Sequence, residues 1–349
     1  MTLQSLRIIQ EDTQRVLAAD LPWAELDGAR IVVTGAAGFL ASGLVRALVA
    51  LHPAGLVRQP LQVVALVRNY ERSRQRLADV ADDPQLEWLR WDLSQFAIPD
   101  LGRPDFILHA ASQASPKFFI RDPMGTLLPN ALGTAALLQA SATARCFLFV
   151  SSSEVYGSVP STAAVDERAF GTLDPASLRA CYAESKRLGE AMCVAWQAQH
   201  GLKTVIVRPF HTYGPGLEAD DGRVFSDFAF AIARGQPIVM TSDGSARRAF
   251  CYSSDATSGL LTVLLKGDPA QAYNLANPQA EMSVLELADC LVTHFAHLGA
   301  RLERQPPPEG YSPSPFNRLV PNIEKLQALG WTPQVKIIEG FERFIEAIS

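Results

Sequence analysis

The chain has 349 residues, of which 48% are hydrophobic and 19% charged, so it can bury a large core in one large domain or two closely joined ones. Its net charge of -5 argues against a general affinity for nucleic acid or for anionic membranes. Acidic side chains at Glu11, Asp12 and Asp20 precede any signal-like stretch, and no run approaches the roughly 18 apolar residues of a membrane span, so we expect a cytoplasmic protein.

The first 28 residues predict a helical extension, because apolar side chains recur at helical spacing from Leu3 to Leu21. This extension either covers an edge of the main sheet or contributes to a dimer contact.

The stretch from Ala29 predicts a strand, a glycine turn and a helix, which is the order of a Rossmann dinucleotide-binding unit. Gly35 and Gly38 permit a tight turn and close approach of a pyrophosphate to the backbone. The helix expected from Phe39 offers its free N–H groups and its dipole to the negative charge. Ala41 takes a third small position, where the helix packs closely on the sheet.

Four further apolar runs, separated by helical stretches, indicate parallel strands covered on both faces. We therefore predict an α/β fold with a Rossmann-type doubly wound parallel sheet and a smaller C-terminal substrate-binding lobe. Gly and Pro become denser after Tyr213, and the stretch 305–316 can hold only a loop. The strands are expected to start near Leu61, Leu86, Asp105 and Cys146, and the domains to be 1–28 for the extension, 29–212 for the NAD(P)-binding part and 213–349 mainly for the substrate lobe, with some chain returning to the first.

Tyr182 and Lys186 lie four residues apart in a predicted helix and therefore project from one face. An ammonium beside a phenol favours the phenolate and draws its pKa down from about 10. Tyr182 is then able to take the proton of a sugar hydroxyl while a hydride leaves the same carbon, which is alcohol oxidation chemistry.

Several motifs recur in one order along nearly the whole chain: TGAAGFLA from Thr34, HAASQASP from His109, SSSEVYG from Ser151, the Tyr182 and Lys186 pair, and RPFHTYGPG from Arg208. DDGRVFSDF, GSARRAFCYSSDA and LGWTP follow. In this order the chain resembles the extended short-chain dehydrogenase/reductases, the NAD-dependent nucleotide-sugar epimerases, dehydratases and decarboxylases. HAASQASP with CYAESKR, DGRV and RRAF is most similar to the UDP-glucuronate decarboxylases, the UDP-xylose synthases.

The resemblance implies a set of residues around the cofactor and the sugar. Tyr182, Lys186, Ser152 and Glu154 would be catalytic, and Ser115, His211, Arg223 and Arg248 would bind the substrate. The residues implied to bind the cofactor are Gly35, Ala37, Gly38, Phe39, Leu40, Arg68, Asp92, Leu93, Ala110, Ala111, Ser112, Tyr182, Lys186 and Pro209.

The end of the second strand departs from the family, which commonly has an acidic residue there for the adenosine ribose, whereas this chain has Arg68. Arg68, with Arg72 and Arg74 nearby, either pairs with a 2′-phosphate and selects NADP, or stacks on the adenine while Asn69 takes the ribose. The family points to tightly held NAD, with NADP as the alternative. Asp92 either contacts the adenine amino group or caps the next turn, and His109 is expected to be a packed histidine at a strand end.

In SSSEVYG, Ser152 stands where relatives bond the reacting sugar hydroxyl, although serines after a strand also cap turns. The 4,6-dehydratases typically have an Asp and a Glu at the next two positions to remove water, and Ser153 cannot donate a proton as a carboxylic acid does. Ser153 followed by Glu154 is similar to the decarboxylases. Oxidation at C4 of a uronic acid places a ketone β to the carboxylate, and such an acid readily loses CO₂.

Arg223 and Arg248 match positions that contact the diphosphate or the sugar carboxylate in relatives, while Arg247 is an adjacent decoy. Surface pairing of these arginines is the alternative. His211 replaces a common Asn that touches the substrate phosphate or sugar in relatives. Its imidazole can donate one such bond, but its bulk predicts a different sugar pose and leaves the precise substrate open.

We thus expect a cytoplasmic, homodimeric enzyme that acts on a nucleoside diphosphate sugar, most similar to a UDP-glucuronate decarboxylase. A 4,6-dehydratase, a 4-epimerase and a non-catalytic dinucleotide-binding protein are the alternatives. The five cysteines show no metal-ligand spacing, so no metal is expected.

Overall fold

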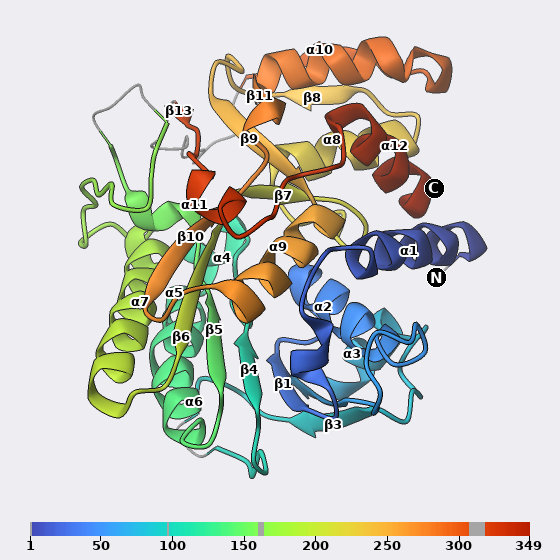
Figure 1. Ribbon diagram of the computed structural model, residues 1–349. Helices are drawn as coiled ribbons and strands as arrows, with labels where there is room; N and C mark the ends of the chain where they lie inside the picture. The colour runs from blue at the N-terminus through green and yellow to red at the C-terminus, as the bar shows by residue number, and fades with distance from the viewer. Residues whose placement is uncertain (1, 96–97, 160–163, 307–317) are drawn as a thin grey trace.

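The computed structural model describes residues 2–95, 98–159, 164–306 and 318–349, and its centre is a parallel sheet of seven strands (Figure 1). Every neighbouring pair in this sheet runs parallel. The strands in spatial order are β10 (Gln271–Leu275), β6 (Thr204–Pro209), β5 (Cys146–Val150), β4 (Phe106–His109), β1 (Arg30–Thr34), β2 (Gln62–Val67) and β3 (Leu86–Arg90). The predicted doubly wound Rossmann fold is thereby confirmed.

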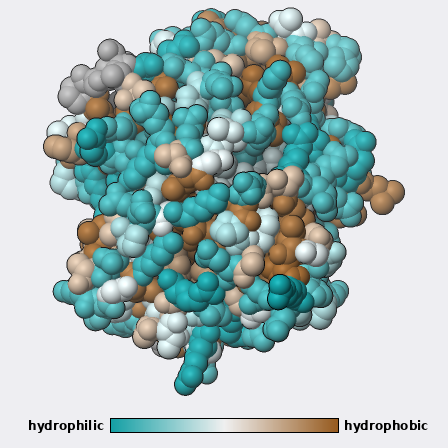
Figure 2. Space-filling model, viewed as in Figure 1, coloured by the Kyte–Doolittle hydropathy of each residue, from teal (hydrophilic) through white to brown (hydrophobic). Residues whose placement is uncertain are grey.

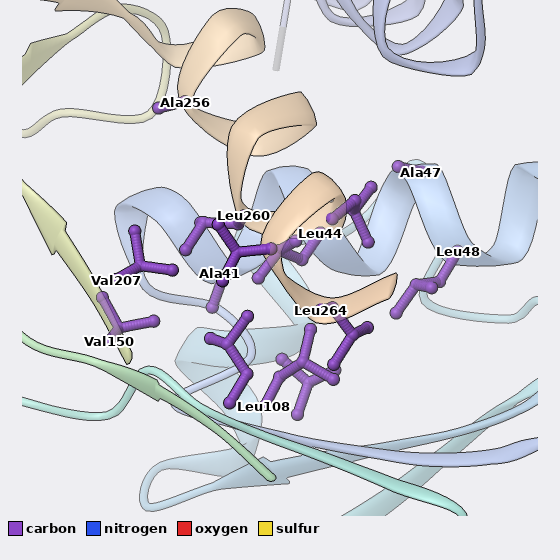
Figure 3. Packing of buried hydrophobic residues seen from close by; sticks show 14 of the residues in the cluster. Ala41, Leu44, Ala47, Leu48, Leu108, Val150, Val207, Ala256, Leu260 and Leu264 are labelled. Carbon is purple, nitrogen blue, oxygen red and sulfur yellow. The ribbon is translucent and has the colours of Figure 1, made fainter. Parts of the chain in front are cut away.

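Successive residues of the strands serve two different cores, because side chains of a strand alternate between the faces of the sheet. In β1, Ile31 and Val33 belong to one buried cluster, and Val32 belongs to the other. On the first face lie α2 (Phe39–Ala50) and α9 (Ser253–Lys266), whose Leu44, Leu260 and Leu264 meet the strand residues Leu108 and Val150 in Figure 3. The opposite face is covered by α6 (Thr134–Ala140) and α7 (Ala180–His200).

The remaining elements of the first half surround the sheet or connect its strands. They are α3 (Tyr70–Arg76), α4 (Pro116–Arg121), α5 (Pro123–Leu128), the π-helical turn η2 (Pro129–Gly133) and the 3₁₀ turn η3 (Ser153–Tyr156).

The N-terminal extension forms α1 (Leu3–Leu17) and a short 3₁₀ turn, η1 (Trp23–Leu26). It does not cover a sheet edge, since the edges are β10 and β3, while α1 packs on α2, α9 and α12 (Ile337–Ile348). Asp12 accepts hydrogen bonds from the Tyr252 hydroxyl at 2.7 Å and from Arg343 Nε at 3.0 Å. Because α1 contacts both α12 and the helices α2 and α9 that cover the sheet, the extension joins the C-terminal helix to the Rossmann core. The hydrogen bonds of Asp12 add to this apolar packing.

A smaller lobe with its own hydrophobic core is built from later segments, which lie together at the top of Figure 1. Its parallel and antiparallel strand pairs centre on β9 and on the β12–β8 pair. The face of the molecule in Figure 2 is mostly hydrophilic, with scattered hydrophobic side chains. The elements of this lobe, with the short helix beside the sheet, are β7 (His211–Tyr213), α8 (Val224–Ala233), β8 (Ile238–Met240), β9 (Arg247–Tyr252), η4 (Pro278–Ala280), β11 (Glu281–Ser283), α10 (Val284–His294), η5 (Ala296–Leu298), β12 (Leu302–Arg304), β13 (Arg318–Leu319) and α11 (Glu324–Gln327).

The loop predicted at 305–316 falls almost entirely outside the described residues. Among the helices that are described, none is long and apolar enough to cross a membrane. The five cysteines are free thiols, and no group of His, Cys, Asp and Glu side chains in the described ranges could hold a metal ion.

Candidate active site

A cavity of about 1310 Å³ lies at the carboxyl ends of the parallel strands, between the sheet and the smaller lobe. This volume exceeds the range of about 300–1,000 Å³ typical of small-molecule sites, so it suits a dinucleotide and a second ligand together. The structure brings every site residue predicted from the sequence to the wall of this one cavity, namely Gly35, Ala37, Gly38, Phe39, Leu40, Arg68, Asp92, Leu93, Ala110, Ala111, Ser112, Ser115, Ser152, Glu154, Tyr182, Lys186, Pro209, His211, Arg223 and Arg248.

The glycine turn after β1 has the geometry that its sequence predicts. Gly35 has φ +62°, a backbone conformation that favours glycine. A Cβ at this position would also lie only 2.8 Å from the Ala111 Cα, so any side chain would clash there. Gly38 is the N-cap of α2, and the helix begins at Phe39. The first N–H groups of α2 are thus able to meet an anion at the cavity wall.

Several buried polar atoms on the cavity wall have no hydrogen-bond partner among the described residues. They are Ser112 Oγ, Gln113 Oε1, Arg179 Nε and His211 Nδ1. Leaving a buried polar group without a hydrogen bond costs roughly 1–3 kcal/mol. A cluster of such atoms on one cavity wall therefore indicates that a bound ligand supplies the missing hydrogen bonds. With the glycine turn, this wall fits a dinucleotide and a polar second ligand.

Arg68 follows β2 directly and lines the cavity, and its charge helps to lower the pKa of Asp92. The larger cause of that shift is the turn after Asp92, whose carboxylate accepts bonds from the Ser94 N–H at 3.0 Å and hydroxyl at 2.8 Å. Asp92 therefore caps the turn while facing the cavity. Arg74, which the sequence grouped with Arg68, instead pairs with Asp82 and lies outside the cavity wall.

Tyr182 and Lys186 share one face of α7, but their ionisation differs from the prediction. Burial raises the pKa of Tyr182 to about 12 and lowers the pKa of Lys186 to about 7, because both side chains leave water. The Lys186 Nζ donates to the Val150 carbonyl at 2.7 Å and lies 5.9 Å from the centre of the Tyr182 ring. In the protein alone, desolvation therefore outweighs the expected stabilisation of the phenolate.

Ser152 caps its turn and also lies beside the Tyr182 phenol, while its contact with the sugar hydroxyl stays a prediction. Its hydroxyl accepts a bond from the Glu154 N–H at 3.2 Å, which caps η3, and it also hydrogen-bonds the Tyr182 phenol, which opposes the rise in that pKa. The position after it, Ser153, is buried. Ser152 is thereby fixed beside the phenol by the backbone of its own turn.

Glu154 lies on the cavity wall between two arginines. Burial raises the pKa of its carboxyl, while the charges of Arg179 and Arg248 oppose that rise. Arg179 Nη2 is 3.5 Å from Glu154 Oε1, and only 6% of Arg248 is exposed to solvent. Two cations thus flank a carboxylate close to Tyr182, whose own pKa responds to Glu154.

The remaining predicted substrate residues approach from the smaller lobe and the loop after β4. Arg223 makes a two-pronged pair with Asp221, and the Ser115 hydroxyl donates to the Asp221 carbonyl. Arg247 instead pairs with Glu281 and Glu286 and does not line the cavity, which supports its assignment as the decoy.

The two histidines near the site are both held neutral by burial. His109 hydrogen-bonds Thr34 at 2.8 Å and Thr134 at 3.1 Å, and burial lowers its pKa to about 3, as suits a packed histidine at a strand end. Burial also lowers the pKa of His211, whose ring stands edge-on between Phe225 and Phe250.

Sequence reasoning did not single out Arg179 or Glu190. Arg179 lies one turn before Tyr182 on the same helix start, and this spacing was the available signal. Glu190 accepts a bond from Ser151 at 2.5 Å and pairs with Arg208 at 2.6 Å, and its charge raises the pKa of Lys186 against the effect of burial. The strand register that brings Ser151 and Arg208 to Glu190 is visible only in the fold.

Comparison with known proteins defines the class. The model of the NAD dependent epimerase/dehydratase family matches residues 31–276, and the chain belongs to this family. It is 34% identical over 313 residues to UDP-glucuronic acid decarboxylase 6 of Arabidopsis thaliana, covering 89% of this chain and 86% of that relative. The resemblance stated from the motifs is thus confirmed.

Solved structures agree on the fold. The dTDP-glucose 4,6-dehydratase of Streptomyces venezuelae, solved with NAD bound, superimposes with a TM-score of 0.76 at 26% identity over 91% of this chain and 96% of that one. A UDP-glucose 4-epimerase of Thermotoga maritima gives 0.77 at 22% identity, over 91% and 98%.

Proposed function

We propose that this protein is a nucleotide-sugar enzyme that uses NAD to oxidise a sugar at C4, and that it decarboxylates UDP-glucuronate. The observation that carries the decarboxylation is the placement of Arg179 and Arg248 around Glu154, beside the hydroxyls of Tyr182 and Ser152. Arginine engages a carboxylate through two oxygens, so this corner suits an acidic sugar better than a neutral hexose. The relatives named UDP-glucuronic acid decarboxylases support the same choice.

The chain's own residues supply the proton transfers. A dinucleotide held at the glycine turn would supply the acceptor for the C4 hydride and the donor that returns it. Ser152 is placed to orient the C4 hydroxyl, and Tyr182 takes its proton as the general base. Lys186 stands one turn along the helix, where its ammonium stabilises the developing phenolate once the cofactor and sugar complete the site.

Loss of CO₂ follows from the ketone. The bond from C5 to the carboxyl carbon breaks, its electron pair enters the C4 carbonyl as an enolate, and a proton is then added at C5. Arg248 holds the carboxylate beforehand. Glu154, which lies on the cavity wall close to Tyr182, is placed to deliver that proton.

The alternatives are distinguished by particular residues. A 4,6-dehydratase needs an acid where this chain has buried Ser153, and a 4-epimerase would keep the substrate's carboxylate. A non-catalytic dinucleotide-binding protein has no use for the hydrogen bond between Tyr182 and Ser152.

The assembly and setting are further parts of this proposal. Exposed apolar side chains at Leu188 and Val194 of α7, with Ile120 of α4 and Met124 of α5, favour a homodimer with a second copy of this chain across these packed helices. Free thiols favour a cytoplasmic setting. The division at residue 212 into a cofactor part and a substrate part remains a prediction.

The test is a mass-spectrometric comparison of products after incubation with NAD and one sugar at a time. UDP-glucuronate should give UDP-xylose or its 4-keto precursor, while UDP-glucose and dTDP-glucose should give no 4-keto-6-deoxy sugar. A product lighter by water from a hexose, or an epimer that retains its carboxylate, would overturn the decarboxylase assignment.

A further inference from the structure

Three arginines follow the end of β2 at positions 68, 72 and 76, and Arg72 and Arg76 stand one turn apart on the same face of α3. Arg68, Arg72 and Arg76 all line the cavity. They stand where a Rossmann fold receives the adenosine ribose of its dinucleotide, so an additional phosphate on that ribose would meet this face.

A carboxylate from the other lobe already occupies part of this basic face. Glu218 forms ion pairs with Arg72 and with Arg76 Nη1, the latter at 2.6 Å, and Arg76 Nη2 donates to the Gly216 carbonyl at 2.6 Å. Glu218 and Gly216 also line the cavity. The contact spans residues more than a hundred positions apart in sequence and joins the two sides of the cavity.

The segment that carries Glu218 is held in place by its backbone and by a second attachment. Gly216 at φ +97° and Gly222 at φ +82° turn the chain in a region that favours glycine. On its far side, Lys117 Nζ donates to the Asp220 carbonyl at 2.6 Å and to the Asp220 carboxylate at 2.7 Å. Glu218 is therefore presented to α3 by a segment that is attached at both ends.

We propose that Glu218 is a specificity-determining residue for the cofactor: by pairing with Arg72 and Arg76 it fills the anion site beside the adenosine ribose and so disfavours NADP relative to NAD. This inference rests on the proposed use of a dinucleotide. A 2′-phosphate would have to displace the carboxylate from both guanidinium groups or bind beside a like charge. Arg68 remains for the adenine or ribose, since it makes no ion pair or hydrogen bond within the described residues.

The experiment measures dissociation constants for NADH and NADPH by fluorescence titration of the full-length protein without any sugar. Glu218→Gln should lower the ratio of the NADPH constant to the NADH constant by at least about tenfold, the factor that corresponds to 1.4 kcal/mol. Glu218→Ala should do the same. Asp82→Asn is the matched control, because it breaks the pair with Arg74 on the side of α3 away from the cavity, and it should leave the ratio unchanged.

A double variant shows whether the effect passes through the arginines. Arg72→Gln combined with Glu218→Gln should lose most of the gain for NADPH that Glu218→Gln alone produces. An unchanged ratio in Glu218→Gln and Glu218→Ala would overturn this inference and leave the proposed function intact. A wild-type protein that binds neither dinucleotide would overturn both.

Discussion

Replacing Tyr182 by Phe removes one oxygen and nothing else from the centre of the proposed site. The ring would keep its stacking on Phe119, where the ring centres are 4.8 Å apart and the planes are 12° apart. The loss is confined to the phenol and its hydrogen bond with Ser152. Fold and cofactor binding should therefore persist, with a change in unfolding free energy of roughly 0.5–1.5 kcal/mol for one hydrogen bond.

The effect on turnover should be far larger, because the phenol is the group that takes the C4 proton. We expect kcat to fall by about 10²–10⁴, the usual contribution of a general acid or base. In the protein alone the phenol pKa is about 12, so the completed site must lower it, and Phe offers no group for that step.

The assay follows reduced nicotinamide absorbance in a single turnover and product release at steady state, with UDP-glucuronate as substrate. Tyr156→Phe is the matched control, since the Tyr156 hydroxyl donates to Asn274 at 2.6 Å away from the cavity wall. That variant should lose roughly 1–3 kcal/mol of stability and keep its chemistry. Tyr182→Phe with most of its turnover intact would refute the proton-transfer role.

Three further predictions concern charges around the cavity. Burial lowers the pKa of Lys186 from the ordinary 10.5 to about 7, so between these two pH values the unfolded chain binds more protons than the folded one. The buried ammonium therefore destabilises the protein fully at and below pH 7, and this destabilisation disappears as the pH rises to 10.5. Lys186→Met should thus raise the melting temperature below pH 7, with a gain that shrinks toward pH 10.5, while activity and cofactor affinity fall; a gain independent of pH would contradict this. Arg68→Asp should weaken NAD and NADP about equally in titrations, because Arg68 is left to contact the adenine or ribose, and a loss of more than about tenfold confined to NADP would instead show a contact with a 2′-phosphate. Arg248→Ala should raise KM for the uronate by losing a charge-assisted bond of roughly 1.5–3 kcal/mol, and equal KM values for Arg248→Ala and the control Arg247→Ala would exclude a carboxylate contact.

The sequence predicted those parts of the fold that depend on local patterns. The start of α2 at Phe39 follows from Gly35 and Gly38, and the strands follow from short apolar runs between helices. The same local logic located Tyr182 and Lys186 on one helix face.

What the sequence could not predict depends on contacts between distant segments. The pKa of Tyr182 is governed by burial that tertiary packing creates, which local spacing does not report. Glu218 reaches Arg72 and Arg76 only because the two lobes meet, and Arg74 is turned away because its pair with Asp82 lies on the opposite side of α3.

The most direct test of the central claim follows the carboxyl carbon of UDP-glucuronate labelled with carbon-13. With NAD and the wild-type protein, the label should leave as CO₂ and be absent from the nucleotide sugar, and Tyr182→Phe should release it at a rate lower by about 10²–10⁴. Label that stays in a nucleotide sugar whose stereochemistry has changed, or label that is not released while the wild-type protein turns over a neutral hexose, would contradict the account.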